Sequence, residues 1–109
     1  MISVYKTIRN RPLLSDKTIK SIVVTVFKKE RLSNNPTLSV HIVGHTRMQS
    51  LNTMYRGVDS PTDVLAFETG EQWGDEQELG DIFLCQPYII DQAKRFGTPD
   101  REEMARMLV

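Results

Sequence analysis

The segment from Leu51 to Phe67 constrains the fold most, because a helix and a buried strand must meet there across a short polar turn. Gly57 can take the left-handed cap that ends a helix, and Pro61 cannot continue one. The run from Val64 to Phe67 is apolar enough for a core strand. Four polar side chains lie close to Gly57 and Pro61 in the sequence, where a loop would present them to a ligand. They are Arg56, Asp59, Thr62 and Asp63.

The chain is long enough for one hydrophobic core and too short for two, so we expect a single domain over residues 1–109. Its 14 basic and 14 acidic side chains cancel, so any nucleic acid would have to bind a local basic patch. The single cysteine, Cys85, excludes an internal disulfide and fits a reducing compartment. The sequence shows neither a signal peptide nor an apolar span, so we expect a cytoplasmic protein without a membrane partner.

Hydrophobic periodicity predicts the elements before the turn. Alternating apolar residues indicate strands over 2–8 and 38–43. Between them, an apolar stripe at helical spacing indicates a helix that Ser15 or Asp16 can cap and that Ser33-Asn34-Asn35-Pro36 ends. Thr46 and Gln49 have the spacing of a capping box for the next helix. Its predicted buried residues are Met48, Leu51 and Tyr55.

After the Val64 to Phe67 strand, the acidic, glycine-containing segment from Glu68 to Glu78 predicts a flexible loop. Leu79 to Cys85 is apolar on both faces, as expected for an interior strand. Two helices follow, one from Pro87 to Gly97 and one from Thr98 onward. The order of elements predicts an α+β fold, in which helices pack on a small mixed four-stranded sheet in two or three layers; an α/β arrangement is the alternative.

Two linked blocks carry a family resemblance. The first is Leu-Asn-x-x-Tyr-Arg at 51–56 with Pro-Thr-Asp-Val-Leu-x-Phe at 61–67, and the second is Leu-Gly-Asp-Ile at 79–82. With these blocks the sequence resembles the YbeY family, bacterial rRNA maturation factors that are metal-dependent endoribonucleases. Ala66 departs from the pattern, since the family usually has serine there, and one hydroxyl near the turn is lost. The resemblance covers the whole chain and implies a topology similar to that of zinc peptidases.

The resemblance also implies a metal site whose ligands this sequence lacks. In the family, the helix that contains Glu102 to Val109 runs into a segment with three histidines, which bind the metal, expected to be zinc, and leave one position open for water. The sequence stops before that segment. We therefore expect a chain truncated before the metal-binding motif, with no metal ligands of its own and no activity alone.

The family's function would be metal-activated hydrolysis of single-stranded RNA during rRNA maturation and ribosome quality control, with the small ribosomal subunit as partner. The alternative is a non-catalytic RNA- or ribosome-binding remnant, because the metal ligands are absent from this chain. A third possibility, an unrelated small α+β interaction module, is disfavoured by the two matching blocks.

His41 and His45 are the remaining candidate metal ligands. Four extended residues span roughly 13 Å, too far for one shared ion unless the chain bends sharply. We expect His41 on a sheet face and His45 just before a helix cap, both without a metal. Cys85, at the end of an apolar strand, is expected to be a buried small hydrophobe.

Arg56 is the strongest candidate for a catalytic role. A guanidinium can bind phosphate through two parallel hydrogen bonds and balance the charge that develops in phosphoryl transfer. The resemblance implies that this position lines the cleft facing the metal. The alternative is an ion pair with Asp59 or Asp63 that fixes the turn.

Asp63 and Asp81 are candidates for a carboxylate pair in acid–base chemistry. An aspartate at a strand edge more often accepts backbone N–H bonds and sets a turn, and the same structural role is expected for Thr62 and Asn52. Basic side chains near the C-terminus could extend a basic surface toward RNA, although a solvated helix face is the default. They are Lys94, Arg95, Arg101 and Arg106.

Overall fold

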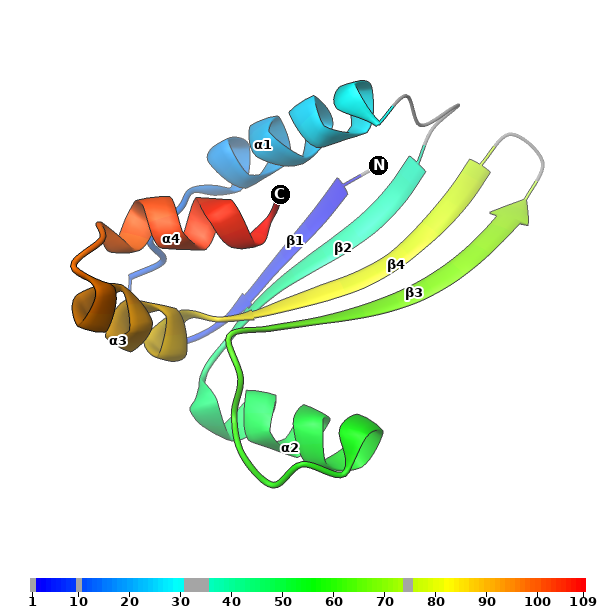
Figure 1. Ribbon diagram of the computed structural model, residues 1–109. Coiled ribbons are helices and arrows are strands. Elements are labelled where there is room, and N and C mark those ends of the chain that lie inside the picture. The colour runs from blue at the N-terminus through cyan, green and yellow to red at the C-terminus, as the bar shows by residue number, and fades with distance from the viewer. Residues whose placement is uncertain (1, 10, 31–35, 74–75) are drawn as a thin grey trace.

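The computed structural model describes residues 2–9, 11–30, 36–73 and 76–109, and its elements follow the predicted order (Figure 1). The strands are β1 (Ile2–Thr7), β2 (Pro36–Val43), β3 (Val64–Trp73) and β4 (Glu76–Cys85). The helices are α1 (Asp16–Lys29), α2 (His45–Arg56), α3 (Gln86–Phe96) and α4 (Asp100–Met107). The predicted α+β class is confirmed. Of the residues expected to end the first helix, 33–35 lie outside the described ranges.

The sheet is mixed, with strand order β1-β2-β4-β3. β1, β2 and β4 run parallel, and β3 pairs antiparallel with β4 at the edge of the sheet. β4 therefore lies between two neighbours, which confirms the interior strand predicted from its apolar character. The carboxyl ends of the three parallel strands meet at one edge, and α2 and α3 begin there (Figure 1).

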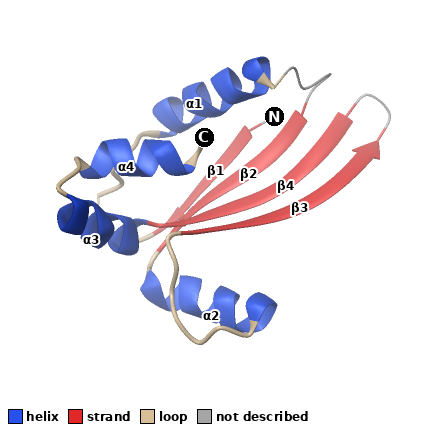
Figure 2. Ribbon diagram, viewed as in Figure 1, coloured by secondary structure: helices blue, strands red, loops and turns tan. Residues whose placement is uncertain are grey.

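Helices cover both faces of the sheet, as Figure 2 shows: α1, α3 and α4 lie on one side and α2 on the other. The larger core joins the first side to the sheet and includes Ile19, Val40, Leu84 and Met104. A smaller core lies under α2. Its buried members are Val43, Met48, Leu51, Leu65, Phe83 and Cys85. Within the described ranges, no helix combines the length and apolar character needed to cross a membrane.

The start of α1 confirms the prediction that Ser15 can cap this helix. Ser15 precedes the helix in an extended conformation, and its hydroxyl accepts a hydrogen bond from the backbone N–H of Thr18 at 3.1 Å. Such a cap satisfies one of the N–H groups that a helix start leaves without an acceptor. Ile19 and Val23, four residues apart, bury the inner face of the helix in the larger core.

The flexible loop predicted over Glu68 to Glu78 is wrong. β3 continues to Trp73 and β4 already begins at Glu76, with Glu71 opposite Glu78 in the ladder. Backbone pairing with β4 gives partners to the N–H and C=O groups on the inner side of this edge strand, so strand formation does not require apolar side chains. The composition of the segment therefore predicted a loop where the two strands of a β-hairpin lie. Residues 74–75 lie outside the described part of the chain.

Two predictions about α2 are also wrong. Gly44, without a side-chain hydrogen bond, precedes the helix, so Thr46 and Gln49 do not form a capping box. Tyr55 is 60% exposed instead of buried. It lies in the last turn, where its ring contacts Phe67 at a centroid distance of 4.8 Å without joining the buried cluster beneath the helix.

Candidate functional site

The turn between α2 and β3 runs back along α2 and is fixed to it by side chains of the helix (Figure 1). Asn52 donates its amide N–H to the carbonyl oxygen of Ser60 at 2.8 Å. Gln49 donates to the carboxylate of Asp59 at 2.9 Å. Asn52 is only 2% exposed, and its side-chain oxygen has no partner within the described residues. The helix thus determines the path of the turn, as the structural role expected for Asn52 requires.

Arg56 is the last residue of α2 and is exposed. Gly57 ends the helix in the left-handed conformation, at φ 68°, as predicted. The predicted alternative, an ion pair with Asp59 or Asp63, is absent from the ion pairs among described residues. The negative end of the helix dipole favours a cation at this position. The guanidinium therefore lies at the helix end with its hydrogen-bond donors open to solvent.

Asp63 sets the entry to β3. Its carboxylate accepts a 2.8 Å hydrogen bond from the N–H of Val64 and a 3.3 Å bond from the hydroxyl of Thr62. Its carbonyl oxygen accepts from the N–H of Cys85 at 2.9 Å, which joins the turn to the end of β4. These bonds are the structural pattern expected for Asp63 and Thr62.

The strand register separates Asp63 from Asp81. Asp63 lies opposite Cys85, whereas Asp81 pairs with Phe67, four residues farther along β3. Four residues of strand correspond to about 13 Å. The two carboxylates therefore do not form a pair for acid–base chemistry.

His41 lies within an aromatic ladder that sequence reasoning missed. Its ring stacks between Tyr5, at 5.0 Å, and Phe83, at 4.3 Å, with interplanar angles of 19° and 11°. Its Nε2 lies 2.9 Å from the carboxylate of Asp81, so Nε2–H donates to Asp81. Phe67 meets the edge of Phe83 at 5.7 Å and extends the ladder toward Tyr55.

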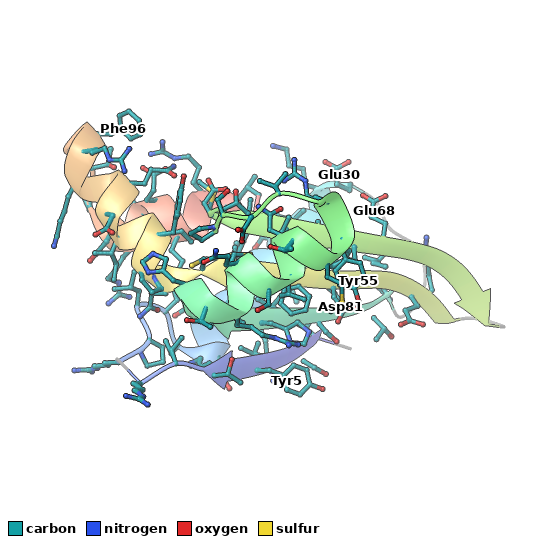
Figure 3. The ribbon with its side chains drawn as sticks, turned by 90° about the horizontal axis from the view of Figure 1, so that it is seen from below. Tyr5, Glu30, Tyr55, Glu68, Asp81 and Phe96 are labelled. Carbon is teal, nitrogen blue, oxygen red and sulfur yellow. The ribbon has the colours of Figure 1, made fainter. Side chains whose placement is uncertain are left out.

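The ladder crosses the sheet on the side that carries α2, and Figure 3 shows Tyr5, Asp81 and Tyr55 on that side. Tyr5, His41 and Phe83 are direct partners across β1, β2 and β4. In the sequence His41 and Phe83 alternate with apolar residues, and Tyr5 follows Val4, which is the only local signal of their shared face. Recognising the ladder would have required the strand order, because the residues are far apart in the chain.

The described residues do not fit a zinc site built from three protein ligands. His41 is held by the ladder, and His45 is the exposed first residue of α2. No group of three or more histidine, cysteine, aspartate or glutamate side chains comes together in the described ranges. His41 lies on a sheet face, as predicted, and His45 begins the helix instead of preceding its cap.

Cys85 is fully buried in the smaller core, which confirms the prediction that it is a small hydrophobe. Burial raises the pKa of its thiol above the usual value, because the thiolate would lose its hydration. The backbone N–H of Tyr88 and the negative charge of Asp63 act more weakly and in opposite directions. The thiol is therefore an unsuitable nucleophile in this conformation.

The basic side chains on α3 and α4 mostly face solvent. Lys94, Arg95 and Arg101 are exposed, and Arg106 lies 3.7 Å from the buried Glu103 in an ion pair along α4. Glu103 also accepts a 2.8 Å hydrogen bond from Thr98, at the start of the helix. These contacts fit the solvated helix face that was the default expectation.

Comparison with known proteins places the chain in a family. The family model described as Endoribonuclease YbeY matches residues 6–109. An Endoribonuclease YbeY from Aquifex aeolicus is 41% identical over 76 residues, which cover 70% of this chain and 51% of the relative. Another, from Sulfurihydrogenibium sp., is 33% identical over 113 residues, covering 95% of this chain and 74% of the relative.

A solved structure has a similar fold. The solution structure of TM1509 from Thermotoga maritima superimposes with a TM-score of 0.68 at 26% sequence identity, covering 99% of this chain and 67% of that protein. The chain thus spans between about half and three quarters of the length of these relatives. Because the family model matches nearly the whole sequence, the chain belongs to the YbeY endoribonuclease family.

Proposed function

We propose that the protein is a nuclease of the hydrolase class that acts on single-stranded RNA, and that Arg56 is its phosphate-binding residue. Its context would be rRNA maturation and ribosome quality control at the small ribosomal subunit, in the cytoplasm. Membership of the YbeY family supports the reaction class. The RNA target, the partner and the compartment are carried over from the family resemblance.

One observation carries the proposed role of Arg56: its guanidinium is exposed and has no ion-pair partner among the described residues. A phosphate could accept two parallel hydrogen bonds from it without displacing an existing carboxylate. Hydrogen bonds from Asn52 and Gln49 hold the adjoining turn against α2, so binding would require little ordering of the backbone. A positioned cation of this kind stabilises charge on a phosphodiester.

Zinc is the cofactor expected for the family, but the described residues provide no ligand set for it. We therefore assign no hydrolytic step to this chain. A second candidate function follows from the same observation: the 109-residue chain alone binds RNA or the ribosome without cleaving it. Binding without cleavage is compatible with the proposed role of Arg56, because phosphate binding by a guanidinium does not depend on a metal.

A cleavage experiment separates the two candidate functions, because only the first predicts cleavage of the RNA. The chain would be incubated with an unstructured, end-labelled RNA in the presence of zinc or EDTA, and binding and cleavage would be followed in parallel. Zinc-dependent cleavage would support the nuclease. For the 109-residue chain alone we expect the second candidate, with binding that is equal in zinc and EDTA and no cleavage above the rate in buffer. Zinc-dependent cleavage that disappears in His41→Ala or His45→Ala would show that the histidines present do support catalysis.

A further inference from the structure

A cavity of about 600 Å³ lies at the end of α2 opposite to Arg56. It opens where β1 and β2 end and where α2 and α3 begin (Figure 1). The carboxyl ends of parallel strands are where open sheets commonly bind ligands. Ten residues of helix separate Thr46 from Arg56, or about 15 Å, so the cavity is distinct from the Arg56 site.

The charged side chains that line the cavity are basic. Arg9 lines it from just beyond the end of β1, and His45 and Arg47 line it from the first turn of α2. No aspartate or glutamate lines it, and none of these three side chains takes part in an ion pair or side-chain hydrogen bond within the described residues. The hydroxyls of Thr46 and Ser50 add further hydrogen-bond donors.

The remainder of the lining increases the effect of these charges. Ile8, Pro87 and Ile90 form an apolar part of the wall, and charges interact more strongly beside apolar surface than in open water. Gly44 leaves the start of α2 without a side-chain cap, and no acidic residue occupies its first turn. Among the described residues that line the cavity, no acidic side chain therefore neutralises Arg9 or Arg47.

We propose that this cavity binds a phosphate group, through the guanidinium groups of Arg9 and Arg47 with donors from His45, Thr46 and Ser50. The ligand is a phosphate monoester or diester, and it comes either from a free nucleotide or from the backbone of an RNA strand. Only the RNA source rests on the function proposed above. In that case the cavity and Arg56 contact the same strand at opposite ends of α2.

Amide chemical shifts of the 109-residue chain provide the first test. The chain would be titrated with inorganic phosphate, with adenosine monophosphate and with an unstructured RNA that lacks terminal phosphates, at constant ionic strength with chloride as control. We expect phosphate to shift the amides of His45, Thr46 and Arg47 selectively. Shifts confined to these residues with the free phosphates, and absent with RNA, identify a nucleotide site; equal shifts with RNA identify a backbone site.

Two pairs of variants separate the charge of the cavity from the structure of the helix. Arg47→Ala should weaken phosphate binding about fivefold, whereas Arg95→Ala on α3 should change it less than twofold. A side chain at Gly44 meets nothing within 4 Å, so both Gly44→Asn and Gly44→Asp can cap α2. The carboxylate should weaken phosphate binding at least fivefold more than the neutral amide does.

Absence of selective shifts with all three ligands, or equal binding by Gly44→Asn and Gly44→Asp, would overturn the phosphate site. Loss of RNA binding with retained phosphate shifts would instead reject the proposed RNA function and leave the cavity as a nucleotide site. The outcomes of the two proposals are therefore distinguishable in one set of samples.

Discussion

His41 donates a 2.9 Å hydrogen bond from Nε2 to the carboxylate of Asp81, forty residues away in the chain. The parallel pairing of β2 with β4 makes the contact possible, because it places His41 beside Phe83 and within reach of the residue two positions earlier. Stacking on Tyr5 and Phe83 fixes the ring, and the aspartate orients it. A histidine that the sequence offers as a metal ligand is thus a structural member of the sheet.

Replacing His41 with alanine should therefore destabilise the fold. We expect His41→Ala to lower the free energy of unfolding by about 2 kcal/mol, because two stacked ring contacts and one hydrogen bond are lost. Urea unfolding followed by circular dichroism measures the change. His45→Ala is the matched control: this histidine is exposed, and its replacement should cost less than about 0.5 kcal/mol. Equal losses in the two variants would contradict the structural role of His41.

Gly80 should not tolerate a side chain. At φ 128°, a Cβ atom there would lie 1.8 Å from the carbonyl oxygen of Phe67 on the neighbouring strand. We expect Gly80→Ala to lower the free energy of unfolding by about 3 kcal/mol or to prevent folding, since a backbone atom must move. At Gly44 the side chain of alanine would have open space, and φ is negative. Gly44→Ala should therefore lower the free energy of unfolding only through its weaker capping of α2, by about 1 kcal/mol or less. Thermal unfolding of both variants compares them, and similar melting temperatures would reject the close approach at Gly80.

The raised pKa of Cys85 predicts a loss of stability at high pH. In the unfolded chain the thiol ionises near its ordinary pKa of 9.0, whereas burial keeps it protonated in the folded chain. The stabilisation is complete below pH 9 and decreases as pH rises above it, because the unfolded state then binds fewer protons than the folded state. Unfolding by urea between pH 7.5 and 10.5 tests this. Cys85→Ala should show a shallower decline, and an identical decline in both proteins would reject the prediction.

Local patterns predicted most of the fold but little of the site. The cap by Ser15, the helix end at Gly57 and the interior position of β4 each depend on chemistry within a few residues, and each is confirmed. The extension of β3 to Trp73 was missed because pairing with β4 outweighs the polar, glycine-containing composition of the segment. The aromatic ladder was missed for a similar reason, since it exists only once the strand order is known.

The cavity at the start of α2 depends on three segments that are distant in sequence. Arg9 and Arg47 are separated in the sequence by one helix, α1, and one strand, β2, and only the parallel arrangement of β1 and β2 brings them to one edge. By contrast, Arg56 was identified from its motif, and the structure adds that neither nearby aspartate neutralises it. A sequence pattern can select a residue type at a turn, but the partners of that residue follow from the tertiary fold.

Arg56 and Arg95 form a matched pair, because both lie in the last turn of a helix closed by a left-handed glycine. Fluorescence anisotropy with an unstructured RNA in EDTA, at several salt concentrations, would give the affinity of the chain and of each alanine variant. We expect Arg56→Ala to bind the RNA roughly fivefold more weakly, and the salt dependence of its affinity to fall by the equivalent of about one phosphate contact. Arg95→Ala should match the unmodified chain in both quantities. Equal affinities for both variants and the unmodified chain would contradict the assignment of Arg56 as the phosphate-binding residue.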